Sequence, residues 1–116
     1  LAAFVYTSGA FVRAQQVRAA LRRRCDALFE WVDLLCTPSQ PGAATPLGSP
    51  AYTTFTGPFN LLGWPAISVP VGLTATGLPL GLQLAGHPWD DATVLRAAWV
   101  VEAGIGHSFH PPNDER

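Results

Sequence analysis

The sequence contains no lysine and no methionine, and the seven residues counted as Lys or Arg are all arginine. A reaction that needs a lysine base therefore has no residue to perform it within these 116 residues. Charged residues make up 13% of the chain, against about 25% in an average soluble domain. Hydrophobic residues reach 48%, so we expect part of the apolar surface to face other protein.

Basic charge is also too scarce for a surface that binds nucleic acid or anionic lipid, since the net charge is −1. The run Arg22-Arg23-Arg24 is best explained as the end of a helix, where positive charge offsets the helix dipole. Apolar runs are broken by Gly and Pro well short of the roughly 20 residues of a membrane span, so no membrane partner is expected. No signal peptide is visible, and a first residue of Leu rather than Met indicates a piece of a longer chain.

Cysteine is rare, and Cys25 and Cys36 lack a Cys-x-x-Cys spacing. We interpret both as buried thiols in a reducing cytoplasm, with a single disulfide left open. The compartment expected from this usage is the cytoplasm.

The hydrophobic pattern predicts an α/β protein. Apolar residues recur at three- and four-residue steps from Phe11 to Val32, as in an amphipathic helix. Two later runs are apolar on both faces, which is typical of covered strands, and they can pair as a hairpin with Pro70 and Pro79 at strand ends. The expected elements are a long helix 8–31, a strand 33–37, a loop 38–52, a short helix 54–62, strands 66–71 and 79–85, and a helix 90–104.

A search for catalytic groups finds little. No serine lies in a Gly-x-Ser-x-Gly turn or has a histidine placed for a triad, and Ser68 is expected to be a small packing residue. His107 and His110 have a His-x-x-His spacing, but no other Cys or His is nearby in sequence to complete a metal site. Asp90 with Asp91 is explained by helix capping. We expect neither a metal nor a cofactor.

Two stretches carry a more specific pattern. The first matches Thr-x-Pro-x-Asn-x-x-Gly-x-Pro-Ala-x-x-Val-Pro-x-Gly at Thr56, Pro58, Asn60, Gly63, Pro65, Ala66, Val69, Pro70 and Gly72. The second matches Gly-Leu-Pro-x-Gly-x-Gln-x-x-Gly at Gly77, Leu78, Pro79, Gly81, Gln83 and Gly86. Together they resemble the C-terminal part of the amidase signature family, and weaker similarity extends over roughly residues 10–112. Trp64 departs from the Leu or Phe that is common in the family.

The resemblance implies a C-terminal fragment of the amidase signature fold, a mixed β-sheet covered by helices. Members hydrolyse amide carbon–nitrogen bonds with a serine nucleophile, a second serine with an unusual cis peptide bond, and a lysine base. Those residues belong to the family's N-terminal half, and this chain has no lysine and no Gly-Ser-Ser run. The resemblance therefore assigns no catalytic residue here and implies two partners, an N-terminal catalytic region and a small-molecule amide.

The family motif residues are then expected to serve as scaffold. Asn60 should form hydrogen bonds across a turn shaped by Gly63 and Pro65, and the other structural motif residues are Pro70, Gly81 and Gln83. The candidates for a substrate-pocket wall are the aromatic residues Trp64, Phe59 and Phe55.

Other interpretations stay open. The chain could be a non-catalytic truncated protein or an interaction module that binds a partner through its apolar surface, and a homo-oligomer is a further option. An A-type component of a glutamyl-tRNA amidotransferase is a special case of the amidase interpretation, to which the near-neutral charge adds no support.

Overall fold

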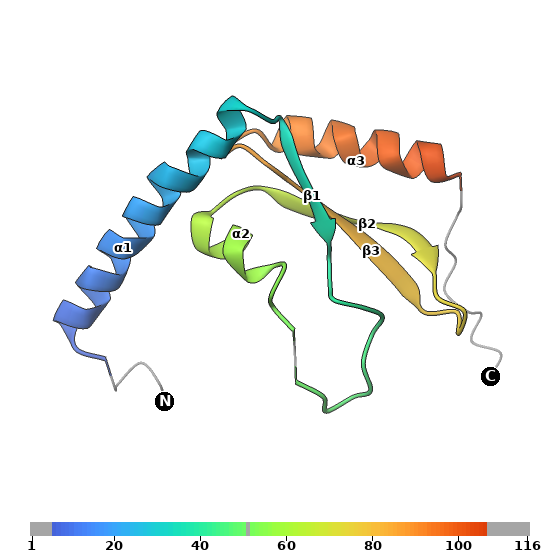
Figure 1. The fold of residues 1–116 in the computed structure, drawn as a ribbon, viewed down its shortest axis with the longest axis horizontal. Helices are drawn as coiled ribbons and strands as arrows, with labels where there is room; N and C mark the ends of the chain where they lie inside the picture. The colour runs from blue at the N-terminus through green and yellow to red at the C-terminus, as the bar shows by residue number, and fades with distance from the viewer. Residues whose placement is uncertain (1–5, 51, 107–116) are drawn as a thin grey trace.

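The computed structural model describes residues 6–50 and 52–106 (Figure 1). Within these ranges the elements are α1 (Ser8–Asp26), a 3-10 turn η2 (Ala27–Glu30), β1 (Leu34–Pro38), α2 (Gly57–Leu62), β2 (Ala66–Leu73), β3 (Pro79–Gly86) and α3 (Asp91–Ile105). None of the helices in these ranges is long and apolar enough to cross a membrane.

The three strands form one sheet in the order β1-β3-β2, and both pairings are antiparallel. β2 and β3 make the expected hairpin, closed by a turn in which the Gly77 N–H donates to the Thr74 carbonyl at 2.9 Å. Gly77 has a φ of 81°, a left-handed conformation that glycine adopts without a steric penalty. The hairpin is therefore fixed by local turn chemistry as well as by its apolar pattern.

Each face of the sheet carries its own small core. On one face α3 packs along the hairpin, as Figure 1 shows, and Val69, Leu84 and Ala98 are buried between them. On the other face the core consists of Phe59, Leu62, Trp64 and Ala85, against which Cys25, Phe29 and Leu35 pack. The alternation of Leu84 and Ala85 between the two cores follows from the two-residue period of a strand.

Helix α1 projects away from the sheet in Figure 1 and has no buried residue. Its first turn is capped because the Ala10 N–H donates to Thr7 Oγ1 at 3.2 Å. Two polar contacts hold it to the rest of the molecule: Arg18 Nε donates to the Leu61 carbonyl, and Asp26 Oδ1 accepts from Trp64 Nε1. The helix thus touches the fold mainly near its C-terminal end.

The element bounds differ from the expectations in three places. The long helix stops at Asp26, and residues 27–30 tighten into the 3-10 turn. The short helix starts at Gly57 rather than 54, because Pro58 suits the first helical turn, where its missing N–H is not needed. Pro70 lies inside β2 instead of at its end, and a register irregularity between Pro70 and Gly72 accommodates it on what is an edge strand among the described ones.

The molecule exposes far more surface than its length requires. Its accessible surface is 9083 Å², whereas a monomer of this length exposes roughly 6,100 Å². The radius of gyration is 17.7 Å, compared with about 13 Å for a compact domain. Exposed apolar side chains lie on both long helices, among them Phe11, Val17, Leu95 and Trp99.

Candidate functional site

The turn after α2 directs the chain from the helix into the sheet. Gly63 has a φ of 72°, and its N–H donates to the Phe59 carbonyl at 2.8 Å. The Trp64 N–H donates to the same carbonyl at 3.1 Å, which completes the helix end. A left-handed residue is needed at this point, so the glycine of the motif has a backbone role.

This turn places Trp64 at the junction of α1, α2 and the sheet. Its ring meets the edge of Phe29 at a centroid distance of 4.7 Å and stacks on Phe59 at 6.0 Å. Its Nε1 donates to Asp26 Oδ1 at 2.7 Å, which satisfies the indole polar group.

Two of the three pocket-wall candidates are packing residues in this structure. Trp64 and Phe59 are 7% and 8% exposed, within the core on the α2 face. Phe55 is half-buried, just before α2. None of the three lines any of the hollows described below.

Gln83 is the one buried polar side chain among the described residues, at 5% exposure. Its Nε2 donates to the Phe55 carbonyl at 2.8 Å and to Thr37 Oγ1 at 3.2 Å. These bonds join β3 to β1 and to the segment before α2. Because an unsatisfied buried amide is costly, Gln83 fixes the position of that segment.

Asn60 differs from its expected role. It is exposed, and its Nδ2 donates to the Thr56 carbonyl at 3.1 Å, one helical turn back, rather than across the turn at Gly63. The connection across the turn is made by the backbone instead, since the Gly86 N–H donates to the Pro65 carbonyl at 3.0 Å.

Gly81 allows two serine hydroxyls to meet above the sheet. Ser39 follows β1 and Ser68 lies on β2, and their Oγ atoms form a hydrogen bond. A Cβ at position 81 would lie 2.7 Å from Ser39 Oγ and 2.8 Å from Ser68 Oγ. The pair borders a hollow of about 290 Å³, bounded also by Gln40 and Pro70.

Sequence reasoning missed this pair and treated Ser68 as a packing residue, although its side chain is exposed. The two serines are 29 residues apart, so no local motif links them. The signal that could have found them is strand register, which places the end of β1 and β2 on either side of β3.

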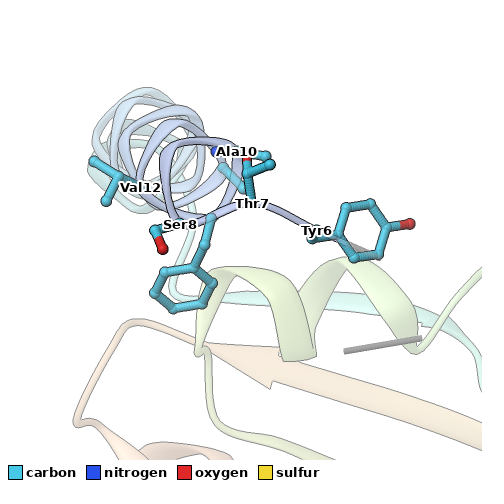
Figure 2. Close-up of a pocket in the computed structure, with 7 residues that line it drawn as sticks. Tyr6, Thr7, Ser8, Ala10 and Val12 are labelled. Atoms are coloured by element: carbon cyan, nitrogen blue, oxygen red, sulfur yellow. Dashed lines mark hydrogen bonds between the residues drawn. The ribbon is translucent and has the colours of Figure 1, made fainter. Parts of the chain in front are cut away.

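Two further hollows are present in the described residues. One, of about 350 Å³, lies on β1, β2 and β3 and includes the exposed Cys36, which was expected to be buried. The other, of about 620 Å³, surrounds the start of α1. Figure 2 shows that its side chains diverge, with Tyr6 and Val12 pointing to opposite sides, so no set of polar groups converges there.

The titratable groups do not form a catalytic arrangement in the described ranges. The pKa of Asp90 is lowered, mainly because the Thr93 side chain hydrogen-bonds to the carboxylate, as expected of a helix cap. His87 Nδ1 lies 2.9 Å from the Pro88 carbonyl, and its ring packs against Phe29. No group of three or more potential metal ligands occurs among residues 6–50 and 52–106. His107 and His110 lie outside the described residues.

The hairpin, the helix α3 packed on it and the turn at Gly63 define a segment of an α/β enzyme core. The Amidase family model matches residues 2–95, and the chain belongs to this family. The chain is 47% identical over 109 residues to the A-type component of the glutamyl-tRNA(Gln) amidotransferase of Cereibacter sphaeroides, and the match covers 85% of this chain and 22% of that protein. The corresponding protein of Rhizorhabdus wittichii is 40% identical over 116 residues, covering 93% and 23%.

Solved structures agree with the family and fold. An amidase crystal structure superimposes with a TM-score of 0.80 at 32% identity, covering 89% of this chain and 26% of that one. The A-type component of the Thermotoga maritima glutamyl-tRNA(Gln) amidotransferase gives a TM-score of 0.66 at 33% identity, covering 78% and 21%. The chain thus spans about a fifth of the length of the curated relatives that it matches. The expected fold class, a fragment of the amidase signature fold, is confirmed.

Proposed function

We propose that residues 1–116 act as the C-terminal scaffold of an enzyme that hydrolyses amide carbon–nitrogen bonds. The serine nucleophile, the second serine and the lysine base that the family uses come from an N-terminal catalytic region. This chain supplies strands of the shared sheet, and Phe55 contributes to the substrate-pocket wall. The substrate is a small amide, and a cytoplasmic location fits the two unpaired cysteines of the described ranges.

The observation that carries the proposal is the excess of exposed surface. An accessible area of 9083 Å² against roughly 6,100 Å² for a compact monomer means that much of the molecule is suited to contact with other protein. The match to about a fifth of much longer relatives supports one occupant above others, the remaining part of an amidase. A helix with no buried residue and several exposed apolar side chains is what such a contact requires.

Within this proposal, the glutamyl-tRNA(Gln) amidotransferase type is the favoured subclass. Eight curated relatives share that description, and identity reaches 47%. The identity to a solved amidase is 32%.

A chimera tests the proposal. In the Cereibacter sphaeroides relative, the matched segment is replaced by this chain, and ammonia release is measured with glutamine and with simple amides. We expect the chimera to hydrolyse an amide, and we expect the relative without the segment and the purified 116-residue chain to release none. Turnover by the purified chain that survives Ser68→Ala would overturn the scaffold proposal.

A second candidate function follows from the outer face of α3, where Leu95, Trp99 and Val100 are exposed. Such a row suits an interaction module or a homo-oligomer contact. Light scattering separates this option from the first. A discrete dimer of the purified chain that unfolds cooperatively would favour it, whereas association relieved by the catalytic region would favour the scaffold.

A further inference from the structure

We propose that the hollow above Gly81 binds the uncharged carboxamide end of a small molecule through Ser39 and Ser68. The choice of an amide as the ligand rests on the proposed function, but the hollow and its chemistry stand on the geometry alone. Three strands meet there: β1 delivers Ser39, β3 provides Gly81 as the floor, and β2 delivers Ser68.

Glycine at position 81 creates the space for the two hydroxyls. The Ser39 N–H donates to the Gly81 carbonyl at 2.9 Å, which holds the residue after β1 close to β3. Any side chain at 81 would begin within 2.7–2.8 Å of both serine oxygens and would push them apart. The hydroxyl pair therefore depends on a residue without a Cβ.

The pair has hydrogen-bonding capacity to spare. Each serine hydroxyl offers one donor and two acceptor lone pairs. The single bond between Ser39 Oγ and Ser68 Oγ uses one donor, so the second O–H and several lone pairs face the hollow. A carboxamide complements this set, because its carbonyl accepts one hydrogen bond and its NH₂ group donates two.

Charge decides against other polar ligands. The hollow's lining contains no ionisable side chain, and apart from the serines it presents Gln40 and the apolar Pro70, Pro79 and Leu80. A carboxylate or an ammonium group would lose water there without gaining an opposite charge, which costs far more than moving a neutral amide. A volume of about 290 Å³ suits a ligand of a few heavy atoms.

The test is a titration of the chimera described above with butyramide, and with butyrate as the charged isostere, followed by ligand-observed saturation-transfer NMR. This readout needs no turnover, and the same titration is run on the 116-residue chain. We expect Ser39→Ala and Ser68→Ala each to weaken butyramide binding about threefold to tenfold, the effect of one hydrogen bond. Gly81→Val should abolish binding, and butyrate should not bind.

Gly72→Ala is the matched control, because a Cβ there meets nothing within 4 Å. It should leave the dissociation constant unchanged. Equal butyramide binding in the wild type and both serine variants, or equally tight binding of butyrate, would overturn the inference. Binding that depends on the serines in a chimera without turnover would refute the proposed function and leave this inference standing. Turnover without such dependence would do the reverse.

Discussion

The two long helices of this molecule meet the sheet in different ways. α3 lies along the β2–β3 hairpin and buries Val94 and Ala98 against it, so this half of the fold closes on itself. α1 is longer, yet none of its residues is buried, and Phe11 is 62% exposed. Its connection to the sheet runs through the Trp64 cluster and the Arg18 hydrogen bond. One helix finishes a core, and the other presents an apolar surface to something else.

This difference shows how a segment of an enzyme divides its apolar residues. Hairpin residues find their partners within about 40 residues of sequence, since β2, β3 and α3 are consecutive. The apolar side chains of α1 have no partner among the described residues that would bury them. The amidase relatives are four to five times longer, which supports the proposal that those partners belong to another part of the enzyme.

The sharpest way to break the comparison is to remove the junction between the two halves. Trp64→Ala should destabilise the fold by about 3–5 kcal/mol, because it leaves a cavity among Phe29 and Phe59 and frees α1 from the sheet. Urea unfolding followed by circular dichroism measures the loss. Asp26→Ala, which removes only the hydrogen bond to the indole, is the control and should cost about 1 kcal/mol.

The same variant tests whether Trp64 belongs to a pocket wall. If its main role were contact with substrate, Trp64→Ala would leave the unfolding curve unchanged and raise the KM of the chimera. A stable Trp64→Ala protein would therefore contradict the packing assignment and return Trp64 to the candidate binding residues.

The turn that feeds Trp64 into the core is the next most sensitive point. Gly63→Val should cost about 1–2 kcal/mol, since a β-branched residue is strained at a φ of 72°. A Cβ at this site would meet only Arg18 Nη2 at 3.6 Å, so strain rather than collision is being measured. Gly42→Val is the control, because position 42 has open space and no positive φ. Equal melting temperatures for the two variants would show that the turn does not need glycine.

The sequence is informative where structure is local. Gly63 lies between an apolar run and Trp64-Pro65, which suggests a left-handed turn, and the TATG turn predicts the hairpin. The failures involve distant partners. Whether Trp64 packs or lines a pocket depends on Asp26 and Phe29, and no local pattern relates them to it. The Ser39–Ser68 pair likewise exists only because β3 lies between β1 and β2.

The capping of α3 gives a smaller effect that sharpens the description of the self-contained half. Hydrogen bonds from Thr93 lower the pKa of Asp90, and the carboxylate accepts the Thr93 N–H at 3.3 Å. A lowered pKa means that this stabilisation is present above the usual value of 3.8 and is lost as the pH falls through the folded-state value. Asp90→Ala should therefore lower Tm at neutral pH, with the difference shrinking in acid.

Asp90→Asn separates the cap from the charge, because asparagine caps helices about as well as aspartate. Its Tm at neutral pH should stay close to that of the wild type. An Asp90→Ala deficit that persists unchanged below about pH 3 would mean that the ionised carboxylate is not what stabilises α3.

The smallest expected change in stability comes from the outer surface of α1, and it tests the comparison from the other side. Replacing Phe11, Val17 and Leu21 together by Gln should change the unfolding free energy of the 116-residue chain by no more than about 0.5 kcal/mol per site, because these side chains are exposed. Self-association of the chain, measured by light scattering, should fall, since apolar contact between copies is removed. In the chimera the same variant should lower Tm, whereas Gln15→Ala with Gln16→Ala should not. Unaltered association together with an unaltered chimera would mean that α1 faces water in the enzyme, and the contrast between the two helices would then reflect solvent exposure rather than a missing partner.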